Sequence, residues 1–399
     1  MQTKTGVLVA CTIGNMVGVT PMVYTVFGLF LIPISTEFDW PRAAVSGVLF
    51  VLAVMAAISF PIVGRAIDRY VPRRILLPGI AAFAASIALI SQAGASYWKF
   101  YSLFAILGIA AAIPSPAMYT KVIAAWFDAR RGFALGIAGG VGNGIGAAIS
   151  PIIVAAFIAQ FGWRGGFVGV GAIIATIGLP TLLLLLRDPP RLIGDQAVNA
   201  EGMTLRHALR TRAFWMLLTA IALGAGCMTA VFAHVVPMLM DRGIASEDAV
   251  TVLVTFSGIT AAWQIGIGIL LDRMPKPWIA APFYIAAIAG LILLESSNAQ
   301  PTLLLAGVLM GLGLGTEYGV LPFLLSRYFG VAHYGAISGV AYGSIALVQG
   351  ITPFLMDVDY DLNGSYHIAV IVICVMMLFG AGLLARLPAV NPAPLALKA

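Results

Sequence analysis

Long apolar runs alternate with short charged clusters along the whole chain. A run of about 20 apolar residues is long enough to cross the hydrocarbon core of a bilayer as a helix. Divided at its charged clusters, the chain predicts twelve such helices, with cores at 6–34, 43–63, 75–95, 98–126, 132–160, 164–186, 213–240, 247–271, 277–295, 301–326, 334–356 and 366–385. The pattern therefore predicts an all-α membrane protein.

The longest polar stretch, residues 187–212, separates six predicted helices from the following six. We expect an N-terminal six-helix bundle over 1–186, a cytoplasmic linker over 187–212 and a C-terminal six-helix bundle over 213–399. The last part of the linker is expected to form a short surface helix.

Composition supports the membrane interpretation. The chain is 61% hydrophobic and 10% charged, whereas soluble domains are about 45–50% apolar and about 25% charged. The basic residues lie in short clusters between spans, so the net charge of +6 does not indicate nucleic-acid binding. Cys11, Cys227 and Cys374 lie inside apolar runs without metal-ligand spacing, so neither a disulfide framework, a metal nor a cofactor is expected. The first apolar run is too long for a signal peptide.

The distribution of basic residues predicts the orientation. If the loop after the second span is cytoplasmic, cytoplasmic segments hold 17 Lys and Arg residues and outer loops hold four. The outer loops also hold nine acidic residues, among them Asp357. This positive-inside bias predicts that both termini lie in the cytoplasm. The expected location is the inner (plasma) membrane of the cell.

An internal repeat links the two halves. The segment "GRAIDRYVPRR" (64–74) has a weaker copy in "GILLDRMPKP" (268–277), so Asp68 corresponds to Asp272, 204 positions later. Gly132 likewise corresponds to Gly335, 203 positions later. Matches at one near-constant offset predict two pseudo-symmetric six-helix bundles, an arrangement typical of transporters whose solute site lies near mid-membrane.

Because of these residues, the chain resembles a transporter of the major facilitator superfamily. The resemblance extends over the whole length of the chain. The family signature between spans 2 and 3 is roughly G-x-x-x-D-R-x-G-R-R, and this sequence departs from it at Val71. The residues that carry the resemblance are Gly64, Asp68, Arg69, Arg73 and Arg74, with Pro72 as one extra position before the two final arginines, and Gly268, Asp272 and Arg273 form the second copy. The resemblance implies that Asp68 meets the N-terminus of span 11 as a cytoplasmic latch, a role that the helix dipole favours.

Three further segments resemble the monocarboxylate-porter branch of this superfamily, "FGLFLIPISTEFDWPRAAVS" (27–46), "RGFALGIAGGVGNGIGAAISPIIVAAFIAQFGWRGGF" (131–167) and "RYFGVAHYGAISG" (327–339). Members of that branch often carry an Asp and an Arg in span 8 near the position of Gln264. This chain has neither there, which counts against a simple carboxylate substrate.

Glycines recur every four residues in three predicted spans, which gives each helix a smooth face for close packing. The series are Gly132, Gly136, Gly140 and Gly144; Gly335, Gly339 and Gly343; and Gly311, Gly315 and Gly319. We expect these faces to contact neighbouring helices. The G-x-G-x-x-A spacing from Gly142 lies inside an apolar helix, so a nucleotide site is not expected.

Three ionisable residues lie inside predicted spans, where they are costly and by default candidates for function. Glu317 lies roughly 15 Å from the helix end and about 200° around the helix from Gly315; it is a candidate proton carrier, or alternatively a protonated structural residue. His234 is a candidate for proton or solute binding, or a packing residue. Lys121 either extends to the cytoplasmic surface or pairs with an anionic solute.

In the superfamily, spans 1, 4, 7 and 10 line the cavity, and these three residues fall in spans 4, 7 and 10. Other polar or aromatic residues at plausible depths are candidates for solute binding or for packing: Tyr24, Tyr119, Asn143, Gln264, Tyr318, Tyr342 and Gln349.

The sequence thus predicts a secondary transporter, expected to act as a monomer in the bilayer, that moves a small organic solute by proton symport. The solute is expected to be an organic acid or a related metabolite. The alternative is a proton-antiport exporter of drugs, siderophores or metabolites. No ATP-binding motif, clustered catalytic set or soluble output module was found, so an ATP-driven pump, an enzyme and a sensor are not supported.

Overall fold

The computed structural model describes residues 2–188 and 202–389, and these residues are overwhelmingly helical. In them, eleven continuous helical stretches are long and apolar enough to cross a membrane. The longest, Arg131–Leu185, covers 55 residues. Gly162 interrupts it with φ 67° and ψ 179°, a left-handed conformation that breaks the helix. With this break the stretch is two spans, and the prediction of an all-α protein with twelve membrane helices is confirmed.

The chain folds into two compact units, in each of which most contacts are made within the unit. Unit 1 consists of the described residues of Met1–Asp128, Ile137–Val198 and Gly335–Leu347, and unit 2 of those of Ala129–Gly136, Asn199–Tyr334 and Val348–Ala399. Each unit therefore contains one short segment from the other half of the sequence. Most of the predicted linker, residues 189–201, lies outside the described residues. Its end contains the expected short helix, α11 (Leu205–Ala208), capped by the Thr204 hydroxyl.

Unit 1 contains the first six predicted spans apart from the start of the fifth, and several of them are interrupted. Its helices are α1 (Gln2–Met16), α2 (Phe27–Phe38), α3 (Arg42–Arg69), α4 (Pro72–Leu89), α5 (Tyr97–Ala111), α6 (Pro116–Trp126), α8 (Gly142–Ile173) and α9 (Leu179–Leu185), with π-helical turns at Thr20–Tyr24, Ile137–Val141 and Ile174–Gly178. The first 13 residues of α16 that follow Tyr334 also belong to this unit, as Gly335–Leu347.

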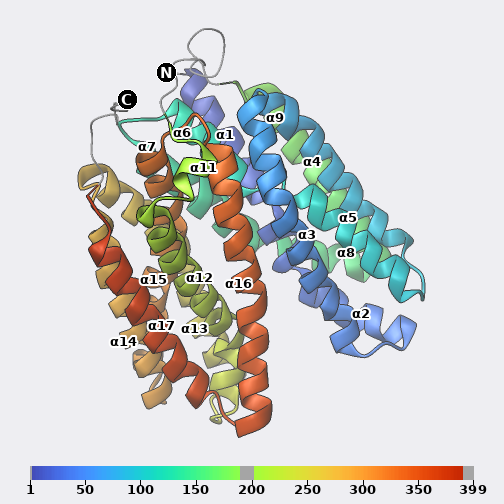
Figure 1. The fold of residues 1–399 in the computed structure, drawn as a ribbon. Coiled ribbons are helices and arrows are strands. Elements are labelled where there is room, and N and C mark those ends of the chain that lie inside the picture. Colours follow the sequence, from blue (N-terminus) through green and yellow to red (C-terminus); the bar gives the residue numbers. More distant parts are fainter. Residues whose placement is uncertain (1, 189–201, 390–399) are drawn as a thin grey trace. The chain divides into compact units, whose positions relative to one another are not determined.

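Unit 2 contains the last six spans apart from Gly335–Leu347, together with the start of the fifth span. Its helices are α7 (Arg131–Gly136), α12 (Arg212–Met240), α13 (Ser246–Arg273), α14 (Ala281–Ser296), α15 (Gln300–Phe329), the remainder of α16 (Tyr334–Asn363) and α17 (His367–Arg386). Helices α12 to α15 and α17 run alongside one another, with α15 packed against both α13 and α14 (Figure 1).

The first and fourth predicted spans are each built from two helices. In the first span, α1 ends at Met16, and a π-turn containing Pro21 leads to α2. The Ser150 hydroxyl donates a 2.8 Å hydrogen bond to the Pro21 carbonyl, so a side chain from α8 bonds to the backbone at this break. In the fourth span, α5 ends at Ala111 and α6 begins at Pro116. Proline lacks the N–H that a continuous helix needs, which the apolar pattern alone does not register.

Two of the three glycine faces pack as expected. A Cβ at Gly339 of α16 would lie 2.4 Å from the Phe60 carbonyl oxygen of α3, and a Cβ at Gly343 would lie 2.8 Å from that of Ala57. On α15, a Cβ at Gly315 would lie 2.7 Å from the Thr260 carbonyl oxygen of α13. These backbones are too close for any side chain to lie between them.

The third glycine series does not form a single face. Gly136 faces α13, where a Cβ would lie 2.4 Å from the Gln264 carbonyl oxygen. The π-turn Ile137–Val141 then changes the helical register, because its turn is wider than that of an α-helix. Beyond it, Gly142 and Gly146 face α1, opposite Thr12 and Met16. Spacing by four therefore predicted a continuous face that the π-turn divides.

Candidate functional site

The carboxylate of Asp68 caps the N-terminus of α16, inside unit 1. Its Oδ1 accepts a 2.8 Å hydrogen bond from the Gly335 N–H, and its Oδ2 accepts a 2.7 Å hydrogen bond from the Ala336 N–H, 268 positions along the chain. These amides belong to the first turn of the helix, where N–H groups have no intrahelical acceptor and the dipole favours negative charge. Gly64, one turn before Asp68, has its Cα against the Gly335 carbonyl. We call this arrangement the Asp68 cap.

The second copy of the motif forms the same arrangement inside unit 2. Asp272 accepts hydrogen bonds from the Gly132 N–H (2.8 Å) and the Phe133 N–H (2.9 Å) at the start of α7. Gly268, one turn earlier, lies against the Gly132 backbone. The sequence repeat is weak around Asp272, yet its helix-end bonds match those of Asp68 in number and length. We call it the Asp272 cap.

The arginines of the motif lie outside the two caps. Arg69 is exposed at the end of α3, and Arg74 and Arg273 are exposed as well. Arg73 donates from its guanidinium to the Leu183 carbonyl at 2.7 Å, and its backbone N–H donates to Asp188. Among the described residues, the acceptors of the capped amides are Asp68 and Asp272, and none of these arginines bonds to those amides.

The departure at Val71 requires no change in the turn between α3 and α4. Val71 has φ −63° and ψ 134°, an extended conformation that any residue adopts. Pro72 follows at the first position of α4, where its missing N–H costs nothing. A glycine is therefore not needed here.

Lys121 is bound to the Asp68 cap from α6. Its side chain is 1% exposed, and its ammonium forms an ion pair with Asp68 Oδ1 and a 2.9 Å hydrogen bond to the Ile67 carbonyl. The sequence suggested either a surface-reaching lysine or a partner for an anionic solute. The structure instead provides an internal carboxylate, which sequence spacing did not reveal because Asp68 and Lys121 are 53 positions apart.

Glu317 lies in the interior of unit 2 and is 1% exposed. A Cβ at Gly224 of α12 would lie 2.4 Å from Glu317 Oε1 and 2.5 Å from the Tyr284 hydroxyl of α14. Neither carboxyl oxygen has a hydrogen-bond partner among the described residues. The carboxyl therefore faces α12 and α14, while Gly315 faces α13, as the predicted 200° separation requires. An ionised carboxylate buried without a partner is costly, and binding a proton removes that cost.

The next residue, Tyr318, is 42% exposed and belongs to a polar network. The Gln349 side-chain amide donates a 3.0 Å hydrogen bond to the Thr229 hydroxyl and a long 3.5 Å hydrogen bond to the Tyr318 hydroxyl. The three side chains come from α16, α12 and α15. Thr229 was not a sequence candidate, since a threonine in an apolar helix carries no signal of its own. We call these residues the Tyr318 network.

His234 links α12 to the second part of α16. Its Nδ1 lies 2.8 Å from the Ala230 carbonyl oxygen and its Nε2 lies 2.8 Å from Asp357 Oδ1. Both ring nitrogens thus face oxygen atoms, one of the backbone and one of a carboxylate. The ring also lies 5.5 Å from that of Tyr366, centroid to centroid. The sequence identified His234 but not its partner, because Asp357 was counted among the outer-loop acids.

The other five candidates come from five different elements. Tyr24 is 41% exposed at the end of the first π-turn, whereas Tyr119 is fully buried on α6. Gly14 makes room for Tyr119, because a Cβ there would lie 2.6 Å from the tyrosine hydroxyl oxygen. Gln264 is buried on α13, and Asn143 and Tyr342 are half-buried on α8 and α16.

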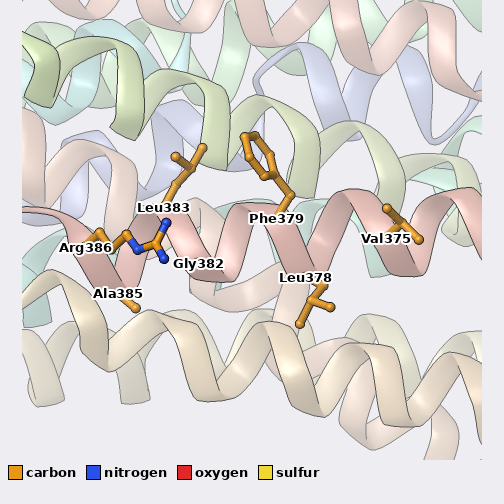
Figure 2. Close-up of a pocket in the computed structure, with 7 residues that line it drawn as sticks. All are labelled: Val375, Leu378, Phe379, Gly382, Leu383, Ala385 and Arg386. Atoms are coloured by element: carbon orange, nitrogen blue, oxygen red, sulfur yellow. The ribbon is translucent and has the colours of Figure 1, made fainter.

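None of the candidate residues lines the groove that runs along α17. Figure 2 shows that Val375, Leu378, Phe379, Gly382, Leu383 and Ala385 line it together with one polar side chain, Arg386. Such an apolar lining fits lipid rather than a polar solute. Across residues 2–188 and 202–389, no three His, Cys, Asp or Glu side chains lie close enough to hold a metal ion.

Comparison with known proteins relates the chain to transporters. The sequence profile of the Major Facilitator Superfamily matches residues 14–353. Monocarboxylate transporter 13 of Bos taurus is 24% identical over 91% of this chain and 84% of its own length. The uncharacterized MFS-type transporter YcxA of Bacillus subtilis (strain 168) is 24% identical over 59% of each chain, so that match spans less than two thirds of the relative.

Solved structures of transporters share the fold. The human organic anion transporter MFSD10 (TETRAN) superposes with a TM-score of 0.70 at 15% identity, covering 96% of this chain and 100% of that chain. The fucose:proton symporter FucP of E. coli superposes with a TM-score of 0.71 at 14% identity, covering 97% of this chain and 100% of that chain.

Proposed function

The chain belongs to the Major Facilitator Superfamily and is a multi-pass membrane transporter, not an enzyme; from this premise we propose that it moves a small organic solute by proton-coupled symport, with Glu317 as the proton-binding group. The observation that carries the proposal is the burial of the Glu317 carboxyl without a hydrogen-bond partner among the described residues. A membrane-embedded carboxyl in that setting is costly to ionise, so its loss and gain of a proton can be coupled to helix rearrangement.

The Tyr318 network is the proposed contact for the solute. Tyr318 adjoins Glu317 in the chain and is 42% exposed, and its hydroxyl, the Gln349 amide and the Thr229 hydroxyl offer donors and acceptors suited to carboxyl or hydroxyl groups. The name of the relative monocarboxylate transporter 13 favours an organic acid as the solute class. The remaining sequence candidates stay proposed solute contacts or packing residues.

We propose that the two caps take part in alternating access. A carboxylate that bonds two N–H groups of a helix N-terminus forms a contact that can be made and broken as a unit. The Asp68 cap is proposed to hold the cytoplasmic exit closed, so that Asp68→Asn shifts the balance toward the inward-open state. Accessibility of cytoplasmic-side reporter cysteines that is unchanged in this variant would remove the cap from the mechanism.

The proposed location is the inner membrane, with both termini in the cytoplasm and the chain acting as a monomer. The proposed orientation rests on the excess of basic residues in alternate loops. A C-terminal fusion to a reporter that is active only in the periplasm tests it, and strong activity of that fusion contradicts the orientation.

Transport by purified protein in lipid vesicles tests the function. The wild-type protein is expected to accumulate at least one labelled compound from a set of organic acids when the outside is more acidic than the lumen. Glu317→Gln is expected to lose that gradient-driven accumulation while retaining exchange of labelled for unlabelled solute, because the amide can no longer gain or lose a proton. The matched control is Glu247→Gln, which changes an exposed acid at the start of α13 and is expected to behave as wild type.

The outcomes separate the alternatives. Accumulation driven by an acidic lumen instead indicates proton antiport and an exporter. Gradient-driven accumulation by Glu317→Gln equal to that of the wild type excludes Glu317 as the proton-binding group. If a broad set of organic acids, amines and sugars is not moved under either gradient, the proposed solute class is wrong.

A further inference from the structure

We infer that Lys121 is a positioning residue that compensates the buried charge of the Asp68 carboxylate and aims it at α16, so that removing the ammonium weakens the Asp68 cap. This inference concerns the cap alone and does not depend on Glu317 or on the identity of the solute. Its basis is the ammonium of Lys121, which touches both Asp68 and the carbonyl of the preceding residue, Ile67.

The two contacts fix the position of the ammonium and that of the carboxylate together. The Ile67 carbonyl accepts from Lys121 at 2.9 Å, which anchors the ammonium to the last turn of α3 itself. Oδ1 of Asp68 is shared between Lys121 and the Gly335 N–H, and Oδ2 accepts from the Ala336 N–H. A carboxylate held by a cation on one side and by two helix-end amides on the other has a single favourable orientation.

Burial makes the charge of Lys121 necessary. The Asp68 side chain is 9% exposed and that of Lys121 is 1% exposed. Taking a carboxylate out of water is costly unless an opposite charge and hydrogen bonds compensate for it. Without the ammonium, the alternative way to neutralise Asp68 is to bind a proton, and a protonated carboxyl accepts hydrogen bonds from α16 less well.

Other charged groups near Asp68 do not replace Lys121. Arg65 and Arg69 lie on α3 but are exposed, and His333 is exposed at the start of α16. The guanidinium of Arg73, on α4, is bonded to the Leu183 carbonyl. Exposed charges interact weakly with a buried carboxylate because water and salt screen them.

The second cap provides an internal comparison. At the repeat offset of 203, the position that corresponds to Lys121 is Leu324, a fully buried apolar residue of α15. The Asp272 cap has the same two amide bonds without a lysine at that position. The repeat has therefore kept the carboxylate and the glycines in both copies, whereas the buried lysine belongs to the first copy.

Hydrogen–deuterium exchange of the full-length protein tests the inference without any solute. The readout is the protection of the peptide that carries the Gly335 and Ala336 amides, corrected for intrinsic exchange, between about pH 5 and pH 8. In the wild type we expect constant protection. In Lys121→Met we expect protection to fall about tenfold or more as the pH decreases, because hydrogen bonds to a charged acceptor are lost.

Two further variants show that the effect passes through Asp68. Asp68→Asn is expected to have low protection at every pH, and Asp68→Asn/Lys121→Met is expected to be equally insensitive to pH, since no carboxyl remains to titrate. The α7 peptide, which carries the Gly132 and Phe133 amides bonded to Asp272, is expected to keep wild-type protection in all variants.

Protection of α16 in Lys121→Met that stays as constant as in the wild type overturns the inference, as does a pH dependence that persists in the double variant. If Lys121→Met is too unstable to purify, thermal unfolding in membranes decides the question. The double variant, which has no unpaired buried charge, is then expected to unfold at a higher temperature than Lys121→Met. An equal or lower temperature contradicts charge pairing.

Discussion

Adding one methyl group at Gly64 is expected to open the Asp68 cap. In Gly64→Ala the new Cβ would lie 2.0 Å from the Gly335 carbonyl oxygen and 2.7 Å from its carbonyl carbon. Ordinary contact between such atoms is about 3.5 Å. The obstacle is backbone rather than a movable side chain, so α3 and the start of α16 must separate by about 1.5 Å, the difference between these two separations.

That separation is enough to break both helix-end hydrogen bonds. Their lengths of 2.8 and 2.7 Å would both exceed 4 Å, beyond hydrogen-bond range. Each bond to a charged group contributes about 1.5–3 kcal/mol, so closing the cap becomes less favourable by about 3 kcal/mol or more. This corresponds to roughly a hundredfold shift in the opening equilibrium. Alanine also raises helix propensity by about 1 kcal/mol, but it does so whether the cap is open or closed.

The two effects appear in different measurements. Protection of the Gly335 and Ala336 amides in hydrogen–deuterium exchange is expected to fall by roughly a hundredfold in Gly64→Ala. The matched control is Gly258→Ala in α13, where a Cβ would meet nothing within 4 Å. It is expected to raise stability by up to about 1 kcal/mol and to leave α16 protection unchanged. Wild-type protection in Gly64→Ala would refute the steric reasoning.

Three smaller predictions concern contacts elsewhere in the two units. Asp272→Asn is expected to lower the protection of the α7 amides about tenfold and to leave α16 unchanged, since the two caps have separate acceptors; equal losses in both helices would contradict this. His234→Phe is expected to lower the free energy of unfolding by about 1–3 kcal/mol, and a double-mutant cycle with Asp357→Asn is expected to show coupling rather than additivity. Glu37→Gln removes the ion pair between Glu37, whose side chain is 40% exposed, and Arg164, whose side chain is 42% exposed. Its cost in thermal unfolding is expected to be below about 1 kcal/mol, and a much larger loss would mean that the pair is not surface-like.

The membrane helices were predictable because hydropathy is a local property of the chain. A run such as 301–326 is apolar whatever surrounds it, and the structure has a helix there, Gln300–Phe329. The interruptions in the first and fourth spans were not predicted, although Pro21 and Pro116 mark them. Proline inside a membrane helix is often tolerated with a kink, so its effect depends on which neighbouring groups, such as the Ser150 hydroxyl, bond to the backbone at the break.

Sequence by itself determined the helical class and the repeat at an offset of 203–204 positions. It also identified the carboxylates and glycines of both caps, because spacing by four along a helix places Gly64 and Asp68 on one face. Only the tertiary structure decided what covers each face. It set Lys121 against Asp68, 53 positions away, and Glu317 against Gly224 and Tyr284. Helical periodicity specifies the direction of a side chain about its own axis, whereas its partner depends on how neighbouring helices rotate and pack.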